Sequence, residues 1–276
     1  MQFNVSFDTA NSPDLGKLTQ AEQQAILATM NAAAQIWSHY LTPSNVTIDI
    51  KIAIDNRLFS GNVLADGGPD AYAPTGATFN GKPVYDTGTA IKLRGGGDIN
   101  GAAPEIDIGL TVDSIRNYLS FKTDDSAAVP AGRYDALSVF LHEIGHGLGF
   151  IDTGDFASFP GAGVFDTFVQ NGKFTGANAE AAAGMPLGIA LEPGSLSHVS
   201  ESGAFGGDLM SPALTAGTNV HISALDLVID IPASALAQTS FVTGSTGDVL
   251  QVRAFDGKSW SAADGTVWAA IHLTVR

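Results

Sequence analysis

The segment YDALSVFLHEIGHGLG, residues 134–149, restricts the fold more than any other part of the sequence. Asp135 stands where an N-terminal helix cap would stand. Apolar side chains then recur at helical spacing, at Leu137, Leu141, Ile144 and Leu148. The pattern predicts a helix that packs on a core, and its other face carries two histidines and a glutamate.

His142 and His146 are four residues apart, so a helix places their imidazoles on one face, about one turn from each other. Both rings can then bind one metal ion, with Glu143 beside the ion rather than against it. A carboxylate in that position can take a proton from a water that zinc acidifies and pass it to a leaving amine. The pattern is typical of zinc hydrolases, although two histidines can also fall at this spacing by chance.

Three glycines in the same helix weigh against chance. Gly145, Gly147 and Gly149 each cost a helix up to about 1 kcal/mol relative to alanine. Close approach of neighbouring segments, and a sharp turn at Gly149, would explain why they are there.

The extended pattern resembles that of the metzincin metalloproteases, His-Glu-x-x-His-x-x-Gly-x-x-His/Asp followed later by a Met-turn. The matching residues are His142, Glu143, His146 and Gly149. Asp152 stands at the next family position, where some metzincins use an aspartate as the third metal ligand. The resemblance implies an α+β fold with a twisted mixed sheet, an active-site helix and a Met-turn.

A second candidate for the third ligand is His198, in SLSHVSESGAFGGDLMSPAL. In the leishmanolysin-like type of metzincin the helix motif ends in Gly-Phe, a long insertion follows, and the third histidine comes shortly before a Leu-Met-x-Pro turn. Gly149-Phe150 and Met210 fit that arrangement, so the resemblance favours His198 over Asp152. A third imidazole also leaves the metal dipositive, whereas a carboxylate would weaken its effect on water.

In the same resemblance Met210 implies a hydrophobic floor beneath the ligands. Some metzincins carry a tyrosine just after the Met-turn that hydrogen-bonds the transition state. The corresponding stretch here, MSPALTAG, has no tyrosine, so the zinc or another donor must stabilise the oxyanion.

The amino-acid composition limits the classes of partner that the chain is expected to bind. The 276-residue chain has a net charge of -15, which repels phosphate backbones and anionic lipid, so nucleic acid and membrane insertion are not expected. No apolar run is long enough to span a bilayer, and no signal peptide is recognisable. The absence of cysteine excludes disulfides and thiolate metal sites, and it fits both bacterial exported proteins and many cytosolic ones. We expect a secreted or cell-surface monomer that acts on proteins or peptides.

The rest of the sequence is organised around this helix. Alternating patterns predict strands at 3–8, 46–54 and 105–110, and Thr19 and Glu22 have the spacing of a capping box at the start of a helix over 18–41. Residues 60–105 predict loops and an irregular hairpin around a sheet edge, and ISALDLVI, residues 222–229, predicts a last helix. We assign 1–230 to a catalytic domain and 231–276, with three strand-like stretches, to a small β-rich segment.

Other candidate ligands are weaker. The loop carboxylates Asp66, Asp70, Asp98, Asp107 and Asp113 could contribute to calcium sites, but such groups are commonly just solvated, so no calcium site is assigned. The stretch LRGGGDING resembles one copy of a calcium-binding repeat and is predicted to be a turn, because a lone copy cannot stack. His39, His221 and His272 are interpreted as structural or surface residues.

These patterns together predict a zinc endopeptidase that binds an extended peptide antiparallel to the edge strand of its sheet. Glu143 is the expected base, with His142, His146 and either His198 or Asp152 as ligands. The alternative is an exported surface or adhesion protein whose metal site is structural or inactive. An intact Glu143 argues against that alternative, because a structural site has no need of the carboxylate.

Overall fold

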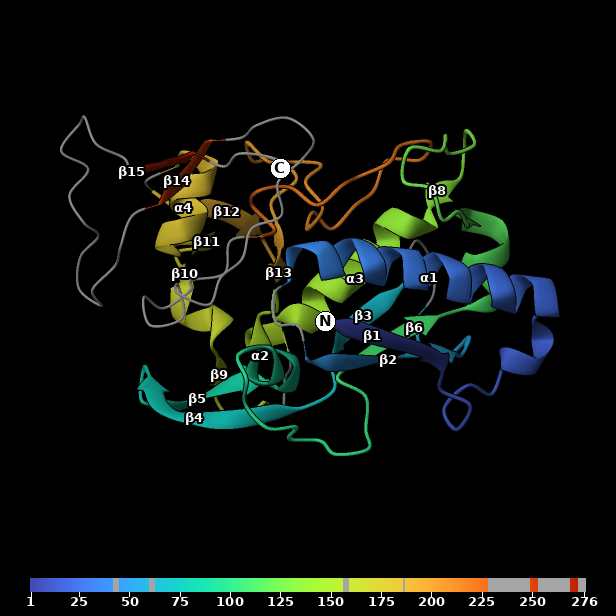
Figure 1. Ribbon diagram of the computed structural model, residues 1–276, viewed down its shortest axis with the longest axis horizontal. Helices are drawn as coiled ribbons and strands as arrows, with labels where there is room; N and C mark the ends of the chain where they lie inside the picture. Colours follow the sequence, from blue (N-terminus) through green and yellow to red (C-terminus); the bar gives the residue numbers. More distant parts are fainter. Residues whose placement is uncertain are drawn as a thin grey trace. The chain divides into compact units, whose positions relative to one another are not determined.

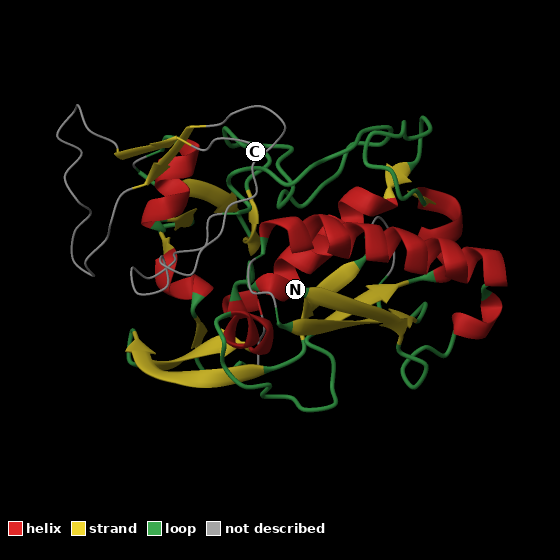
Figure 2. Ribbon diagram, viewed as in Figure 1, coloured by secondary structure: helices red, strands yellow, loops and turns green. Residues whose placement is uncertain are grey.

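The computed structural model describes residues 1–41, 45–59, 63–155, 159–185 and 187–227, together with the backbone of 249–252 and 269–272. Its contacts divide the chain into two compact units, Met1–Val228 and Ile229–Arg276. The first unit mixes helices with several sheets, which confirms the α+β class expected from the sequence (Figure 2).

The main sheet of the first unit contains β1 (Gln2–Phe7), β2 (Thr47–Ile54), β6 (Ile106–Leu110) and β3 (Asp66–Pro69), in the spatial order β1-β2-β6-β3. β1, β2 and β6 are parallel, whereas β3 runs antiparallel to β6 at the edge of the sheet. β2 alternates as its sequence predicts: Ile48, Ile50, Ile52 and Ile54 are all fully buried. The predicted strands at 3–8, 46–54 and 105–110 are therefore confirmed.

Two long helices, α1 (Gln20–Tyr40) and α3 (Ala136–Leu148), cover one face of this sheet (Figure 1). Thr19 and Glu22 form the predicted capping box of α1. The Asp135 carboxylate caps α3, where it accepts hydrogen bonds from the backbone N–H groups of Leu137 and Ser138. The Trp37 Nε1–H donates to the Leu141 carbonyl at 3.0 Å and so joins the two helices.

The glycines of α3 have the roles that their positions suggested. A Cβ at Gly147 would lie 2.6 Å from Ile106 Cγ2 of β6, so the helix sits against the sheet at a distance that only glycine allows. A Cβ at Gly145 would lie 2.7 Å from Met210 Sδ. Gly149 ends the helix with φ at +124°, in the region that favours glycine.

Residues 60–105 form the edge strand and hairpin expected of them. β4 (Tyr72–Phe79) and β5 (Lys82–Thr87) pair antiparallel around Asn80-Gly81, both at positive φ as a tight hairpin turn requires. Short α2 (Gly88–Leu93) follows, and β9 (Ala162–Gly163) joins β5. Near the start of α3, β7 (Leu119–Ser120) pairs with β8 (Tyr134–Asp135).

The part of the chain after α3 is built from short pieces. β10 (Val169–Gln170), β11 (Lys173–Phe174), β12 (Ile189–Glu192) and β13 (Ser195–Val199) form a second antiparallel sheet, and α4 (Ala177–Ala183) lies between β11 and β12 in sequence. Single 3-10 turns occupy Thr153–Asp155 and Phe165–Phe168.

The predicted helix over 222–229 is not found in its described part, because 222–223 have no regular structure and 224–227 form turns. The Asp226 carboxylate accepts the Ser223 N–H at 2.6 Å and closes a local turn there. In the second unit β14 (Val249–Val252) pairs antiparallel with β15 (Ala269–His272), within two of the predicted strand stretches. The third stretch, 240–244, lies outside the described residues. Among the residues described, no helix is long and apolar enough to cross a bilayer.

Candidate metal centre

His142 and His146 lie together on α3, as their spacing predicts. Their Nε2 atoms are 2.9 Å apart and the ring planes are nearly perpendicular, at 87°. The helix places both rings on the face turned away from the Leu137 side of the core.

The structure brings His198 of β13 to this pair. One ring nitrogen from each of the three histidines lies within 4.8 Å of the others, and the His198 ring centroid is 5.2 Å from His142 and 4.8 Å from His146. Within the described residues, this is the only group of three or more histidine, aspartate or glutamate side chains close enough to hold a metal ion. The three histidines could therefore hold a metal ion.

Hydrogen bonds fix the histidines of α3 in one tautomer. His142 Nδ1 donates to the Leu209 carbonyl and His146 Nδ1 donates to the Phe150 carbonyl, both at 2.7 Å. Because a carbonyl only accepts, each Nδ1 carries the ring proton, and each neutral ring has a lone pair on Nε2. The contact of 2.9 Å between the two Nε2 atoms is then no hydrogen bond but two lone pairs facing each other. A cation that both lone pairs coordinate would remove their repulsion.

The rings are also held neutral. Burial lowers the pKa of His142 to about 4, and the neighbouring His198 acts in the same direction. Burial lowers the pKa of His146 well below its usual value, as do the other two histidines, and burial lowers the pKa of His198. Neutral imidazole is the form that binds metals, so the centre has the protonation state of a ligand set at neutral pH.

His198 is oriented differently from the other two. Its Nδ1 lies 2.8 Å from the hydroxyl of Ser195, at the first position of β13. The hydroxyl can donate or accept, so this contact positions the ring without setting its tautomer. β13 is tied to the methionine turn, because the Val199 N–H donates to the Met210 carbonyl at 2.8 Å.

Met210 is buried against α3, next to Gly145. Its side chain is 1% exposed and its sulfur packs against the Cα of Gly145, between the two helix histidines in sequence. The preceding residue, Leu209, provides the carbonyl that orients His142. The turn is therefore both an apolar floor and a hydrogen-bonding partner of the centre.

Glu143 is buried beside the histidines, with 6% of its surface exposed. Burial, together with the charge of Asp66 at the start of β3, raises the pKa of Glu143 to about 8. A dication at the histidines would favour the ionised carboxylate and lower that pKa again. The side chain faces Gly67 of β3, where a Cβ would lie 2.9 Å from Glu143 Oε2.

Asp152, the other candidate for the third ligand, is not in the histidine group. It is buried, and its carboxylate accepts the Gly154 N–H at 2.7 Å while its own N–H donates to Ser197 Oγ at 2.8 Å. These bonds stabilise the turn after α3 and join it to β13, next to His198.

The remaining candidates lie apart from the centre. His39 is exposed, His221 pairs with Asp125 at 2.8 Å, and the side chain of His272 lies outside the described residues. None of Asp66, Asp70, Asp98, Asp107 or Asp113 belongs to a group of three possible ligands in the described chain. Asp107 and Asp70 do share a hydrogen bond, and burial together with Asp70 raises the pKa of Asp107 to about 7.

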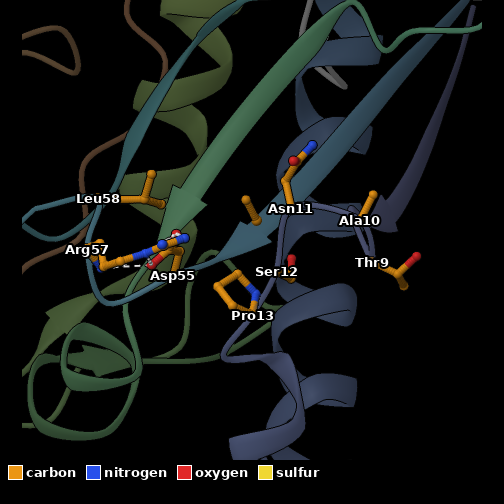
Figure 3. Close-up of a pocket in the computed structure, with 9 residues that line it drawn as sticks. Thr9, Ala10, Asn11, Ser12, Pro13, Asp55, Arg57 and Leu58 are labelled. Carbon is orange, nitrogen blue, oxygen red and sulfur yellow. Dashed lines mark hydrogen bonds and ion pairs between the residues drawn. The ribbon is translucent and has the colours of Figure 1, made fainter.

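A separate polar hollow of about 350 Å³ lies where β1 and β2 end, lined by residues such as Asn11, Asp55 and Arg57 (Figure 3). The Arg57 guanidinium donates to both oxygens of Asp55, whose pKa it lowers to about 2. The charges of the hollow are thus paired with each other, and none of the three clustered histidines lines it.

Sequence patterns did not indicate Ser195, the Leu209 carbonyl or Gly67 as parts of the site. A serine three residues before His198 and a glycine in a loop-rich stretch carry no local signal, and backbone carbonyls carry none at all. Comparison with protein-family models, with curated proteins and with solved structures finds no match for this chain.

Proposed function

We propose that the protein is a zinc endopeptidase of the metzincin type, with His142, His146 and His198 as the metal ligands. The observation that supports this most is the pair of Nε2 lone pairs that face each other at 2.9 Å, with both Nδ1 protons committed to carbonyl oxygens. Such an arrangement costs free energy unless a cation lies there.

The donor set favours zinc. Three neutral imidazoles with nitrogen donors suit zinc, and three protein ligands leave a fourth position open, as catalytic zinc sites do. Zinc held there would supply Lewis acidity, which lowers the pKa of a coordinated water to about 7. The carbonyl and hydroxyl partners on each Nδ1 are of the kind that orient metal-binding histidines.

Glu143 is the residue that handles the proton. Glu143 adjoins His142 on α3 and does not belong to the histidine group, so in this proposal its carboxylate accepts a proton from the attacking water and delivers it to the leaving amine. Burial of a carboxylate is costly, and a structural metal site gains nothing from it.

β3 supplies the binding surface for the substrate. It is the edge of the main sheet among the described strands and passes directly over Glu143 at Gly67. A peptide paired antiparallel with β3 would extend that sheet and place a backbone amide near the base. Proteins or peptides in extended conformation are the proposed substrates.

The second candidate function is a surface or adhesion protein with a structural or inactive metal site. The two proposals differ in what they require of Glu143. Only an enzyme loses its function when that carboxylate becomes an amide.

The test combines metal analysis with a proteolysis assay on casein or gelatin. We expect about one zinc per chain, and hydrolysis that chelation abolishes and added zinc restores. Glu143→Gln should keep the zinc and lose about 10²- to 10⁴-fold in kcat, because the ligands remain while the base is gone.

Zinc bound in both proteins with hydrolysis in neither would favour the structural site. Absence of zinc even after reconstitution would remove the metal proposal itself. Turnover by Glu143→Gln at the wild-type rate would remove Glu143 from the mechanism.

A further inference from the structure

β3 passes Glu143 at a glycine, and the space there is smaller than any side chain. A Cβ built on Gly67 would lie 2.7 Å from Glu143 Cβ, 2.9 Å from Glu143 Oε2 and 3.3 Å from its Cα. Distances of 2.7 and 2.9 Å are well inside the contact distance of two heavy atoms that do not hydrogen-bond. The edge strand and the glutamate are therefore in contact only because position 67 has no side chain.

The backbone does not require a glycine at this position. Gly67 is not among the glycines with positive φ, so an alanine could adopt its conformation. A glycine inside a strand weakens that strand, and a close approach by another group is a usual reason to find one. Here the group that approaches is Glu143.

The neighbouring glycine has a different environment. A Cβ on Gly68 would have Ile151 Cδ1 as its nearest neighbour at 3.6 Å, an ordinary van der Waals contact. Gly67 and Gly68 are thus adjacent glycines in the same edge strand, and only the first touches the glutamate.

We propose that Gly67 is a positioning residue, which sets how closely the Glu143 carboxylate lies beneath the edge of the sheet. The inference rests on the proposed function, in which β3 holds the peptide and Glu143 moves the proton. With the carboxylate directly under the strand, a peptide paired with β3 has its scissile amide within reach of the base. Any side chain at position 67 pushes the strand and the base apart.

The experiment uses the full chain loaded with cobalt, whose visible spectrum reports the ligand shell. Five proteins are compared: wild type, Gly67→Ala, Gly68→Ala, Glu143→Gln, and Gly67→Ala combined with Glu143→Gln. Hydrolysis is measured on a short peptide, and acetohydroxamate binding is measured from the cobalt spectrum. Acetohydroxamate chelates the metal and donates a proton to an adjacent carboxylate, yet it is too small to pair with β3.

Gly67→Ala should bind cobalt with the wild-type spectrum and lose about 10- to 100-fold in kcat, since a displacement of about 1 Å costs that much. KM should change little, and the loss in kcat should exceed that of Gly68→Ala, which adds a methyl group to the same strand without touching Glu143. Gly67→Ala should weaken acetohydroxamate binding about 10-fold when Glu143 is present. In the Glu143→Gln background, Gly67→Ala should not weaken acetohydroxamate binding any further. The hydrogen bond to the carboxylate that Gly67→Ala disturbs is already absent there.

Equal weakening of acetohydroxamate binding by Gly67→Ala in both backgrounds would overturn the inference, as would a kcat no lower than that of Gly68→Ala. If even the wild type hydrolyses no peptide, the proposed function fails, while the acetohydroxamate comparison still decides the role of Gly67. If Gly67→Ala does not fold alone, Gly67→Ala is combined with Glu143→Gly, which removes the Glu143 side chain that the new methyl group would meet. Recovery of folding in that pair supports the contact, and continued failure to fold overturns it.

Discussion

Helix α3 and the segment after it contribute to the histidine cluster in different ways. α3 is a 13-residue helix that supplies two of the histidines, Glu143 and the cap that starts it. The described residues of 149–227 form strands of two to five residues, the short helix α4, 3-10 turns and loops, and they supply His198, Met210 and the carbonyls of Phe150 and Leu209. The helix contributes by local spacing, whereas the second segment contributes only once the whole unit is folded.

The two parts also differ in what orients their histidines. His142 and His146 are held by backbone carbonyls, which no substitution removes. His198 is held by Ser195 on the same short strand, through both the hydroxyl and the backbone of that residue. On β13, single substitutions can therefore separate the contribution of the His198 ring from that of the Ser195 hydroxyl that positions it.

The largest expected effect is the loss of zinc binding and hydrolysis when the proposed third ligand, His198, is removed. His198→Ala should weaken zinc binding by more than the roughly 100-fold that loss of an orienting partner causes, and should abolish hydrolysis. Asp152→Asn should leave the zinc content near one, because Asp152 holds the turn at Gly154 and not the metal. Equilibrium dialysis against a competing chelator measures both. Zinc lost from Asp152→Asn and kept by His198→Ala would make the aspartate the ligand.

A smaller loss of zinc affinity is expected when His198 stays and only its hydrogen bond to the Ser195 hydroxyl is removed. Ser195→Ala should weaken zinc binding about 10- to 100-fold, since the ring loses the hydroxyl that fixes its orientation. Ser202→Ala is the matched control, because the Ser202 hydroxyl bonds the hydroxyl of Ser200 at 3.1 Å rather than a histidine. Unchanged affinity in Ser195→Ala would mean that β13 alone orients the ring.

A third prediction concerns how α3 is seated on the sheet. Gly147→Ala would place a Cβ 2.6 to 2.7 Å from three carbons of Ile106, and such overpacking costs about 1–3 kcal/mol in the free energy of unfolding. Gly16→Ala is the control, since a Cβ there meets nothing within 4 Å, and it should stay within about 0.5 kcal/mol. Urea unfolding of the metal-free proteins measures both. Equal stability of the two variants would show that the helix can shift without cost.

The same contrast explains how far the sequence could predict the structure. Asp135, the capping box at Thr19 and the alternation of β2 are local signals, because caps and periodic burial depend on neighbours in sequence. Gly67 and Ser195 depend on which segments meet in space, and no local pattern encodes that. The expected helix over 222–229 illustrates the limit. Its apolar spacing suits a helix, and Asp226 accepts the Ser223 N–H as a capping residue does, yet the described residues 224–227 form only turns.

Asp226 gives a further predicted difference, in the pH dependence of stability. Burial raises the pKa of Asp226 from its ordinary value of 3.8 to about 8, and both the charge and the hydrogen bond of Asp208 add to the shift. Asp208 adjoins the Leu209–Met210 turn, so the two carboxyl groups join the end of the first unit's described chain to the floor of the metal centre. At neutral pH they share a proton in the folded state.

The sign of the effect follows from the number of bound protons. Between about pH 4 and about pH 8 the folded protein holds a proton on Asp226 that the unfolded chain has released, so this group destabilises the fold progressively as pH rises through that window. Asp226→Asn removes the titration, since its amide can donate to Asp208 and its oxygen can still accept from Ser223. The stability of the variant relative to wild type should therefore increase from pH 5 to pH 8 and level off above that. Urea unfolding of the metal-free proteins at pH 5, 7 and 9 measures the difference, and Asp124→Asn, whose carboxylate has a lowered pKa, should show no such trend over this range. A constant difference between Asp226→Asn and wild type would mean that Asp226 is ionised throughout, and that the turn at 223–226 is held to the metal centre by some means other than a shared proton.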